Sequence, residues 1–425
     1  MEIKKFFFRI KVKFKELWEH KIFRYAIIIQ IFYFVISQIL TLTVFRNTND
    51  FEVYYTVGNL FVNNINDLYN PSNYLWPFRY FPISAILFVP FYLVGFELGF
   101  ILFTVINFIL NALICIILYK IIILTRGKTH ENNDARPILY ICIFLMSLPN
   151  LFNYILGQIN LYVTLLVLLS LFIFLRYEGL KWELIASIIL GISINIKPTT
   201  VFMIPFLLVI NIDLKNKLLK FEFKKSFIRL FGIILPVSIN LIMFLIFPSL
   251  LEGFLATNFT TSEPSQVNHS FSITKLLINF FVFIGFTEGQ IISIQMPLFL
   301  TILMIIGIIG FISFITRKHN NYSLVYGYTL GILIMFLCYF DSWDHHLLNL
   351  IPLLIIILFN LPRNSDLTKK FIKPSIIFFS FLDLAFMGIY FLVDDFFPFN
   401  FASTIFLILV FYGIIKLNNF NKKRE

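Results

Sequence analysis

Two acidic residues directly after the first long apolar run are the first candidates for chemistry. The run spans 22–45, and Asp50 and Glu52 follow it closely. A carboxylate where a membrane helix emerges can be partly desolvated and still reach a wet cavity, which suits a general base. We therefore predict Asp50 as a base. The alternative is that Asp50 caps the helix that follows, because aspartate is a preferred N-cap residue.

A second polar cluster occupies 148–160, LPNLFNYILGQIN, between two apolar runs. Asn150, Asn153, Gln158 and Asn160 are uncharged hydrogen-bonding groups, which suit sugar hydroxyls. The alternative is that they satisfy backbone groups at helix ends. Lys197 also stands between two short apolar runs. A lysine near lipid is costly and is usually functional or extends to the membrane surface, and its ammonium can pair with a phosphate.

The third cluster is the segment DSWDHH, which contains Asp341, Asp344, His345 and His346. Two acids and two imidazoles could bind a divalent metal, but adjacent helical residues point about 100° apart and share one ion poorly. Contact with a phosphate is the better interpretation, and an interfacial cap is the alternative. Asp383 lies inside an apolar run, where an acid is a functional candidate whose partner the sequence does not identify.

The composition of the chain indicates a membrane protein. Hydrophobic types make up 59 % of the 425 residues and charged types 13 %, with a mean hydropathy of +0.86. Soluble domains carry roughly 25 % charged residues. The net charge is +11, and the basic residues flank the apolar runs. This pattern indicates orientation in a membrane rather than nucleic-acid binding. The three cysteines lie inside apolar runs and predict neither a disulfide framework nor a zinc site.

We predict an all-α polytopic bundle of about 12 transmembrane helices that forms a single domain over 1–425, with a basic tail at 1–21. A span needs about 20 apolar residues. The predicted spans are 22–45, 98–124, 137–150, 160–176, 183–197, 199–213, 227–248, 290–316, 322–340, 346–361, 371–392 and 399–417.

The distribution of basic residues decides the orientation. Segment 82–95 is short and contains Pro82 and Pro90, so we predict that it re-enters the membrane without crossing. Of the 34 Lys and Arg residues, only four then lie outside. These are Arg46, Arg79, Lys197 and Lys275, of which we interpret Arg46 and Lys275 as interfacial anchors. Both termini are predicted to be cytoplasmic, and the polar clusters face the outside of the cell membrane.

Two outer loops are predicted, at 46–97 and 249–289. In the first, Tyr54, Val57, Phe61, Ile65 and Leu68 recur at helical spacing and predict an interfacial helix that lies along the membrane surface. The second is rich in Ser, Thr and Asn and is expected to cover an outer cavity.

The polar motifs, in their order along 50–350, resemble those of the polyprenyl-phosphate-mannose-dependent mannosyltransferases of glycosyltransferase family 87, in the GT-C superfamily. Six short motifs carry the resemblance: Asp50-Phe-x-Val-Tyr-Tyr, Leu68-Tyr69, Phe78-Arg79-Tyr80-Phe81-Pro82, Gly157-Gln158-Ile159-Asn160, Ile196-Lys197-Pro198 and Ser342-Trp343-x-His345-His346. The resemblance implies a GT-C-like bundle that takes a hexose from a polyprenyl-phosphate donor.

The resemblance also implies roles for single residues. Asp50 would deprotonate a hydroxyl of a lipid or glycan acceptor, and the anomeric configuration would invert. The leaving phosphate would be held by Arg79, Lys197 and one of the pair His345 and His346. The sugar or acceptor would be contacted by Tyr80, Gln158 and Asn160. Glu52 is a second acid close by, so it is an alternative base or a further contact. No metal and no cofactor are expected.

Two other functions are compatible with the sequence. A lipid-carrier flippase or another transporter would use Lys197 and Asp383 inside the membrane, although it predicts polar groups near the midplane and repeated halves. Another branch of the GT-C superfamily would keep the fold and change the donor or acceptor.

Overall fold

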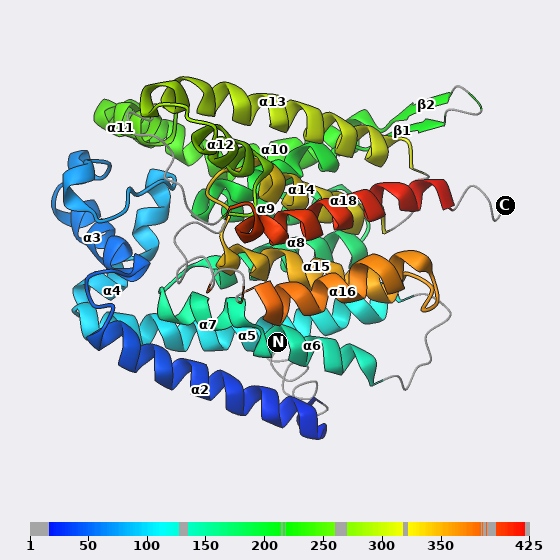
Figure 1. The fold of residues 1–425 in the computed structure, drawn as a ribbon, viewed down its shortest axis with the longest axis horizontal. Coiled ribbons are helices and arrows are strands. Elements are labelled where there is room, and N and C mark those ends of the chain that lie inside the picture. The colour runs from blue at the N-terminus through cyan, green and yellow to red at the C-terminus, as the bar shows by residue number, and fades with distance from the viewer. Residues whose placement is uncertain are drawn as a thin grey trace.

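The computed structural model describes residues 17–126, 135–213, 216, 218–259, 270–317, 322–383, 385, 388 and 397–420. Within them, helices make up almost the whole fold, and a single two-stranded hairpin is the exception. The long helices run side by side along the long axis of the molecule (Figure 1).

Among the described residues, five helical segments are long and apolar enough to cross a membrane. They are α2 (Lys21–Thr43), α5 (Phe96–Thr125), α6 with α7 (Arg136–Met146 and Leu148–Ile155), α10 (Phe223–Ile246) and α13 (Glu288–Ile315). On α10 and α13 many apolar side chains are exposed, such as Leu245 and Met304. A continuous apolar surface of this kind is unfavourable in water, so we interpret it as the surface that faces lipid. The chain is thus an all-α integral membrane protein.

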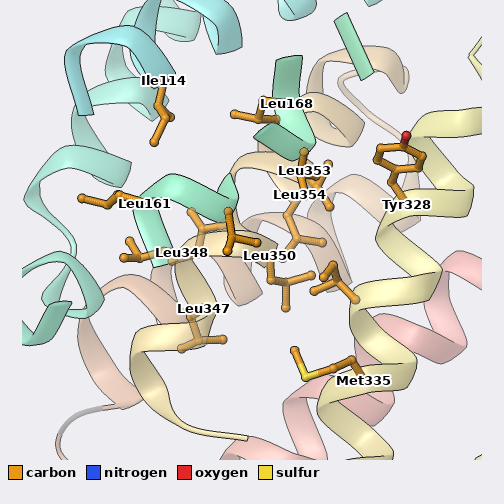
Figure 2. Packing of buried hydrophobic residues seen from close by; sticks show 14 of the residues in the cluster. Ile114, Leu161, Leu168, Tyr328, Met335, Leu347, Leu348, Leu350, Leu353 and Leu354 are labelled. Atoms are coloured by element: carbon orange, nitrogen blue, oxygen red, sulfur yellow. The ribbon is translucent and has the colours of Figure 1, made fainter. Parts of the chain in front are cut away.

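Shorter apolar helices fill the middle of the bundle. They are α8 (Asn160–Arg176), α9 (Leu180–Ile196), α14 (Ser323–Cys338), α15 (Leu347–Asn360) and α18 (Ala402–Phe420). Every side chain of α14 except Leu324 is buried, and leucines of α15 lie among Met335 and Tyr328 of α14 and Leu161 and Leu168 of α8 (Figure 2). These helices are short for a perpendicular span, so the total of 12 crossings stays a prediction.

The predicted helix at 199–213 is wrong in its second half. The chain forms a 3₁₀ helix, η4 (Pro198–Leu207), and then β1 (Ile210–Asp213), which pairs antiparallel with β2 (Leu218–Phe221). Pro205 lacks a backbone N–H and disfavours a regular α-helix here. The predicted helix at 371–392 begins with π turns, η6 (Thr368–Ile372) and η7 (Phe378–Leu382), on either side of α16 (Lys373–Ile377). Most of its remainder lies outside the described residues.

One end of the bundle gathers short helices from distant parts of the chain. After α2 come α3 (Asp50–Asn63), the 3₁₀ turns η1 (Ile65–Asp67), η2 (Pro71–Asn73) and η3 (Pro82–Leu87), and α4 (Val89–Leu93). The predicted loop 249–289 contains two helices, α11 (Pro248–Phe259) and α12 (Ile273–Phe283), and 260–269 lies outside the described residues. In Figure 1, α3, α4 and α11 lie at the end of the molecule opposite the β1–β2 hairpin.

Candidate active site

The first turn of α3 places Asp50 against the turn between α7 and α8. Asn49 is the N-cap of α3, and its side chain accepts a hydrogen bond from the Glu52 N–H at 3.0 Å. The capping interpretation of Asp50 is therefore wrong, and its carboxylate is available for other contacts. The backbone N–H groups of Asp50 and Phe51 donate to the Leu156 carbonyl at 3.0 and 3.3 Å, which fixes α3 on this turn.

Gly157 allows this close approach. Its φ of +68° is in the left-handed region, which favours glycine, and a Cβ atom added there would lie 2.6 Å from the Phe51 Cβ. The glycine of the Gly157-Gln158-Ile159-Asn160 motif therefore has a structural role. It lets the turn pass under the start of α3 and brings Gln158 beside Asp50.

We expect Gly157→Ala to disturb the site more than the fold. The new methyl group requires both a strained backbone and a shift of Phe51, at a cost of about 1–3 kcal/mol of stability. Because Asp50 precedes Phe51, the activity of the site should fall at least about tenfold, the effect of even a small misplacement of reacting groups. Thermal unfolding in detergent and an activity assay measure the two effects. The matched control is Gly285→Ala, which also has positive φ but meets nothing within 4 Å. Equal activity in the two variants would contradict this role for Gly157.

A continuous chain of hydrogen bonds links an acid to a lysine at this turn. The Gln158 amide nitrogen donates to the Asp50 carboxylate at 2.5 Å, while the Gln158 amide oxygen lies 3.4 Å from the Lys197 Nζ. Lys197 Nζ also donates to the Asn160 amide oxygen at 2.9 Å, and Asn160 donates to Asn153 at 3.3 Å. Gln158 thus joins a carboxylate and an ammonium that come from different helices.

Tyrosine hydroxyls extend this chain of hydrogen bonds on the side of α3. The Tyr54 hydroxyl donates to the Gln158 amide oxygen at 3.3 Å and lies 3.1 Å from the Tyr80 hydroxyl. Tyr69 donates to the Tyr80 carbonyl at 2.6 Å, and Lys197 Nζ lies 5.9 Å from the centre of the Tyr80 ring. The sequence pattern places Tyr54 only on the apolar stripe of the predicted interfacial helix. Its position one helical turn after Asp50, on the same face of α3, is the signal that could have identified it.

Burial sets the electrostatics of the acid and the lysine. Lys197 is only 3 % exposed, so the interpretation that it extends to the membrane surface is wrong. Burial lowers the pKa of Lys197 to about 7, although the Asp50 charge opposes this shift. Burial also raises the pKa of Asp50 above its ordinary value, against the hydrogen bond from Gln158 and the charge of Lys197. The two pKa values are therefore drawn toward each other.

The two histidines lie side by side in the 3₁₀ turn η5 (Asp344–His346), before α15. Their ring centres are 4.5 Å apart, and the His346 Nδ1 accepts from the Trp343 N–H at 3.1 Å. Burial, and next the charge of Lys197, lower the pKa of His345 well below its ordinary value. This imidazole is therefore neutral near pH 7 and can donate a hydrogen bond but no charge.

Asp344 and Asp383 form a buried acid pair, which gives Asp383 the partner that the sequence did not reveal. A side-chain hydrogen bond joins the two, and the Ser403 hydroxyl donates to Asp383. Both line a small cavity beside Pro149 of α7. The pair therefore ties η5 to the segment after η7. No three His, Cys, Asp or Glu side chains gather as a metal site in the described ranges.

Arg79 and Lys275 differ from their predicted surroundings. Arg79 forms an ion pair with Asp341, next to the histidine turn. Lys275 is 1 % exposed, so its interpretation as an interfacial anchor is wrong, because an anchor must keep its ammonium in the headgroup region. The positive charge of Arg79 is among the causes that lower the pKa of Lys275. The distribution of basic residues predicts that Arg79 and Lys275 both lie outside the membrane, but it does not predict that they lie near each other.

Glu52 is directed away from the Asp50 network. Its carboxylate accepts from Arg46 at 2.8 Å, and Arg46 also reaches Glu97 at 3.4 Å and lies over the Phe96 ring. The structure thus brings together Asp50, Tyr80, Gln158, Asn160 and Lys197, whereas Glu52 joins a separate ion pair. In the second polar cluster, Asn150 donates to the Phe144 carbonyl at the end of α6 at 2.7 Å, so it satisfies a helix end.

Comparison with known proteins identifies the family of the chain. No curated protein matches the chain. The model of glycosyltransferase family 87 matches residues 78–339, which is more than half of the chain and includes Arg79, Gln158 and Lys197. A match to a glycosyltransferase family gives no support to the interpretation of the chain as a flippase. The chain belongs to glycosyltransferase family 87 and is a membrane glycosyltransferase of the GT-C type.

Proposed function

We propose that this protein moves a hexose, mannose in the first instance, from a polyprenyl-phosphate donor to a lipid or glycan acceptor, with inversion and without a metal. The observation that carries the proposal is the chain Asp50–Gln158–Lys197, in which one buried amide holds a partly buried carboxylate and a buried ammonium. These are the two charges that a displacement at a sugar phosphate needs. The acid takes a proton, and the cation stabilises the departing phosphate.

In the proposed step, Asp50 removes the proton of an acceptor hydroxyl while the acceptor oxygen attacks the anomeric carbon. The bond between the anomeric carbon and the phosphate oxygen breaks, and its electron pair leaves with the polyprenyl phosphate. The sugar ends on the acceptor with inverted configuration, and the proton stays on Asp50. A raised pKa suits Asp50 to this task, because it makes the carboxylate a stronger base.

The leaving phosphate gains a negative charge, for which Lys197 and Arg79 are the proposed charged partners. His345 or His346 would donate a neutral hydrogen bond. Tyr80, Gln158 and Asn160 surround Lys197 and are the proposed sugar contacts. We assign Glu52 no sugar contact because Arg46 holds its carboxylate.

We propose that this end of the bundle faces the outside of the cell membrane and that both termini are cytoplasmic. The support is the positive-inside rule together with the shape of the molecule. The strand β2, which contains Lys220, lies at the end opposite α3 and α4 (Figure 1). The acceptor and donor would then meet at the outer leaflet.

The test is transfer by purified protein from radiolabelled polyprenyl-phosphate-mannose into a total native membrane extract, with EDTA present. We expect labelled product, and we expect polyprenyl-diphosphate sugars and nucleotide sugars to give none. Transfer from a nucleotide sugar alone would refute the lipid-phosphate donor. Transfer that stops with EDTA and returns with a divalent metal would refute metal independence.

A further inference from the structure

The turn that ends α7 leaves two backbone carbonyls for other helices to satisfy. Gly157 adopts the left-handed conformation directly after this helix, and Gln158 follows it. Their N–H groups donate to the carbonyls of the second-last and third-last residues of α7, at 3.2 and 2.9 Å. This pattern is the Schellman motif, which satisfies the carbonyls of the last helical turn. The next two carbonyls, those of Ile155 and Leu156, need partners from outside the helix.

Helices α3 and α2 each supply a partner for one of these carbonyls. The Leu156 carbonyl accepts from the N–H groups of Asp50 and Phe51, at the start of α3. The Ile155 carbonyl accepts from the hydroxyl of Thr41, a fully buried residue of α2, at 2.6 Å. Because a buried carbonyl without a partner is costly, both bonds stabilise this turn. The turn is therefore held by two helices at adjacent carbonyls.

The buried face of α2 makes a second bond of this kind at the other end of α7. The Tyr33 hydroxyl donates to the Met146 carbonyl, which ends α6 just before α7 begins, at 2.7 Å. Thr41 lies about two turns further along the same face, at the end of α2 that leads into α3. At that end, α2 fixes the turn that carries Gln158 and also the point from which the chain continues to Asp50.

The contact between the acid and the amide depends on how this turn is placed against α3. Gln158 follows Ile155 by three residues, and its amide nitrogen donates to the Asp50 carboxylate at 2.5 Å. The Thr41 hydroxyl has one proton and gives it to the Ile155 carbonyl, so Thr41 acts on the carboxylate through the turn. Misplacement of reacting groups by about 1 Å can cost roughly 10²-fold in rate, so a small shift of this turn is sufficient to matter.

We propose that Thr41 is a positioning residue of the transfer reaction, which keeps Gln158 aligned with Asp50 by holding the Ile155 carbonyl. This inference rests on the proposed function and adds to it a residue of α2 that lies outside every motif. Without the Thr41 bond, the turn keeps its attachment to α3 but loses this attachment to α2. The amide then moves relative to the carboxylate.

The loss of this alignment changes the pH dependence of the reaction. Within the described residues, the titratable groups that face Asp50 are Lys197, Tyr54 and Tyr80. The hydrogen bond from Gln158 lowers the pKa of Asp50, and so does the charge of Lys197, whereas burial raises it. A displaced Gln158 therefore raises the pKa of Asp50 further. Because the reaction needs the carboxylate, the acidic limb of kcat/KM moves to higher pH.

The test compares Thr41→Val and Thr41→Ser with the wild-type protein in the transfer assay as a function of pH. Thr41→Val keeps the volume but removes the hydroxyl, and we expect kcat to fall about tenfold and the acidic limb to move to higher pH. The KM for the donor should change less, because Lys197 keeps its bond to Asn160. Thr41→Ser keeps the hydroxyl and should restore both kcat and the acidic limb. If Thr41→Val does not fold, Thr41→Ala measured against Thr41→Ser makes the same comparison.

The matched controls lie on the same helix. Thr43→Val removes an exposed hydroxyl that donates to the Ile39 carbonyl of its own helix at 2.6 Å, and it should behave as the wild type does. Tyr33→Phe removes the bond to Met146 and should lower the Tm without moving the acidic limb. An unchanged kcat and pH profile in Thr41→Val, or the same shift of the acidic limb in Tyr33→Phe, would overturn the inference.

Infrared difference spectroscopy separates this inference from the proposed function. Titration of the Asp50 carboxyl, with Asp50→Asn as the blank, measures the change of its pKa in Thr41→Val without any sugar transfer. A raised pKa in Thr41→Val, together with a wild-type protein that transfers no sugar, would support the positioning by Thr41 and refute the proposed function. An unchanged pKa would refute the positioning by Thr41, even where the wild-type protein transfers sugar.

Discussion

Asp50→Asn is expected to abolish nearly all sugar transfer, with a fall in kcat of about 10²- to 10⁴-fold, the usual contribution of a general base. The amide fills the same volume and can still hydrogen-bond to Gln158, but it cannot accept a proton. The fold should therefore survive, because the backbone contacts of Asp50 and Phe51 with Leu156 do not involve the side chain. Transfer from labelled donor, with thermal unfolding measured in parallel, tests this prediction.

Glu52→Gln is the variant that distinguishes the two acids. It makes the same chemical change two residues away, on a carboxylate that contacts Arg46 rather than Gln158. We expect it to keep activity within a few fold. The control for a carboxylate outside the Asp50 network is Asp67→Asn, on η1, a partly exposed acid that accepts a hydrogen bond from Asn64. Loss of transfer in Glu52→Gln with activity retained in Asp50→Asn would assign the base to Glu52 and refute the mechanism proposed above.

The periodicity and composition of the sequence were sufficient to predict the class of fold. Long apolar runs with basic ends predict α2, α5, α10 and α13, because a lipid-facing helix must be apolar on most of its surface. The predicted spans 322–340 and 346–361 coincide with α14 and α15. These helices are buried by protein rather than by lipid, so their length reflects packing and does not tell whether they cross the membrane. The β1–β2 hairpin was missed because an apolar run with Pro205 has the composition of a short span.

The site shows which relations a sequence can encode. Local relations, such as the glycine before Gln158 or the lysine after α9, were visible as motifs. Long-range relations were not. Asp344 with Asp383, and Arg79 with Asp341, are joined by tertiary packing, and no spacing predicts them. Lys275 stands outside every motif, so the sequence does not predict that it is buried beside the segment that contains Asp341.

The linked pair of Asp50 and Lys197 predicts a narrow pH range for activity. Lys197 is positive below its pKa of about 7 and neutral above it, whereas Asp50 is a carboxylate only above its own raised pKa. The reactive combination, ionised Asp50 with charged Lys197, therefore exists between the two values. We expect kcat/KM for the donor to be bell-shaped in pH and to fall as the pH rises past about 7. A bound phosphate raises the pKa of Lys197, so the decline in kcat should begin at higher pH.

Substitution of Lys197 tests both its charge and this pH limit. Lys197→Met removes the charge beside the leaving phosphate and should lower kcat/KM by about 10²- to 10³-fold, the cost of removing one preorganised stabilising group. Lys197→Arg stays charged throughout the range, so the decline of its residual activity above pH 7 should be less steep than in the wild type. Lys181→Met, at an exposed lysine at the other end of α9, is the control for loss of a lysine. An unchanged alkaline decline in Lys197→Arg would show that another group sets it, and the neutral form of Lys197 would then not limit catalysis.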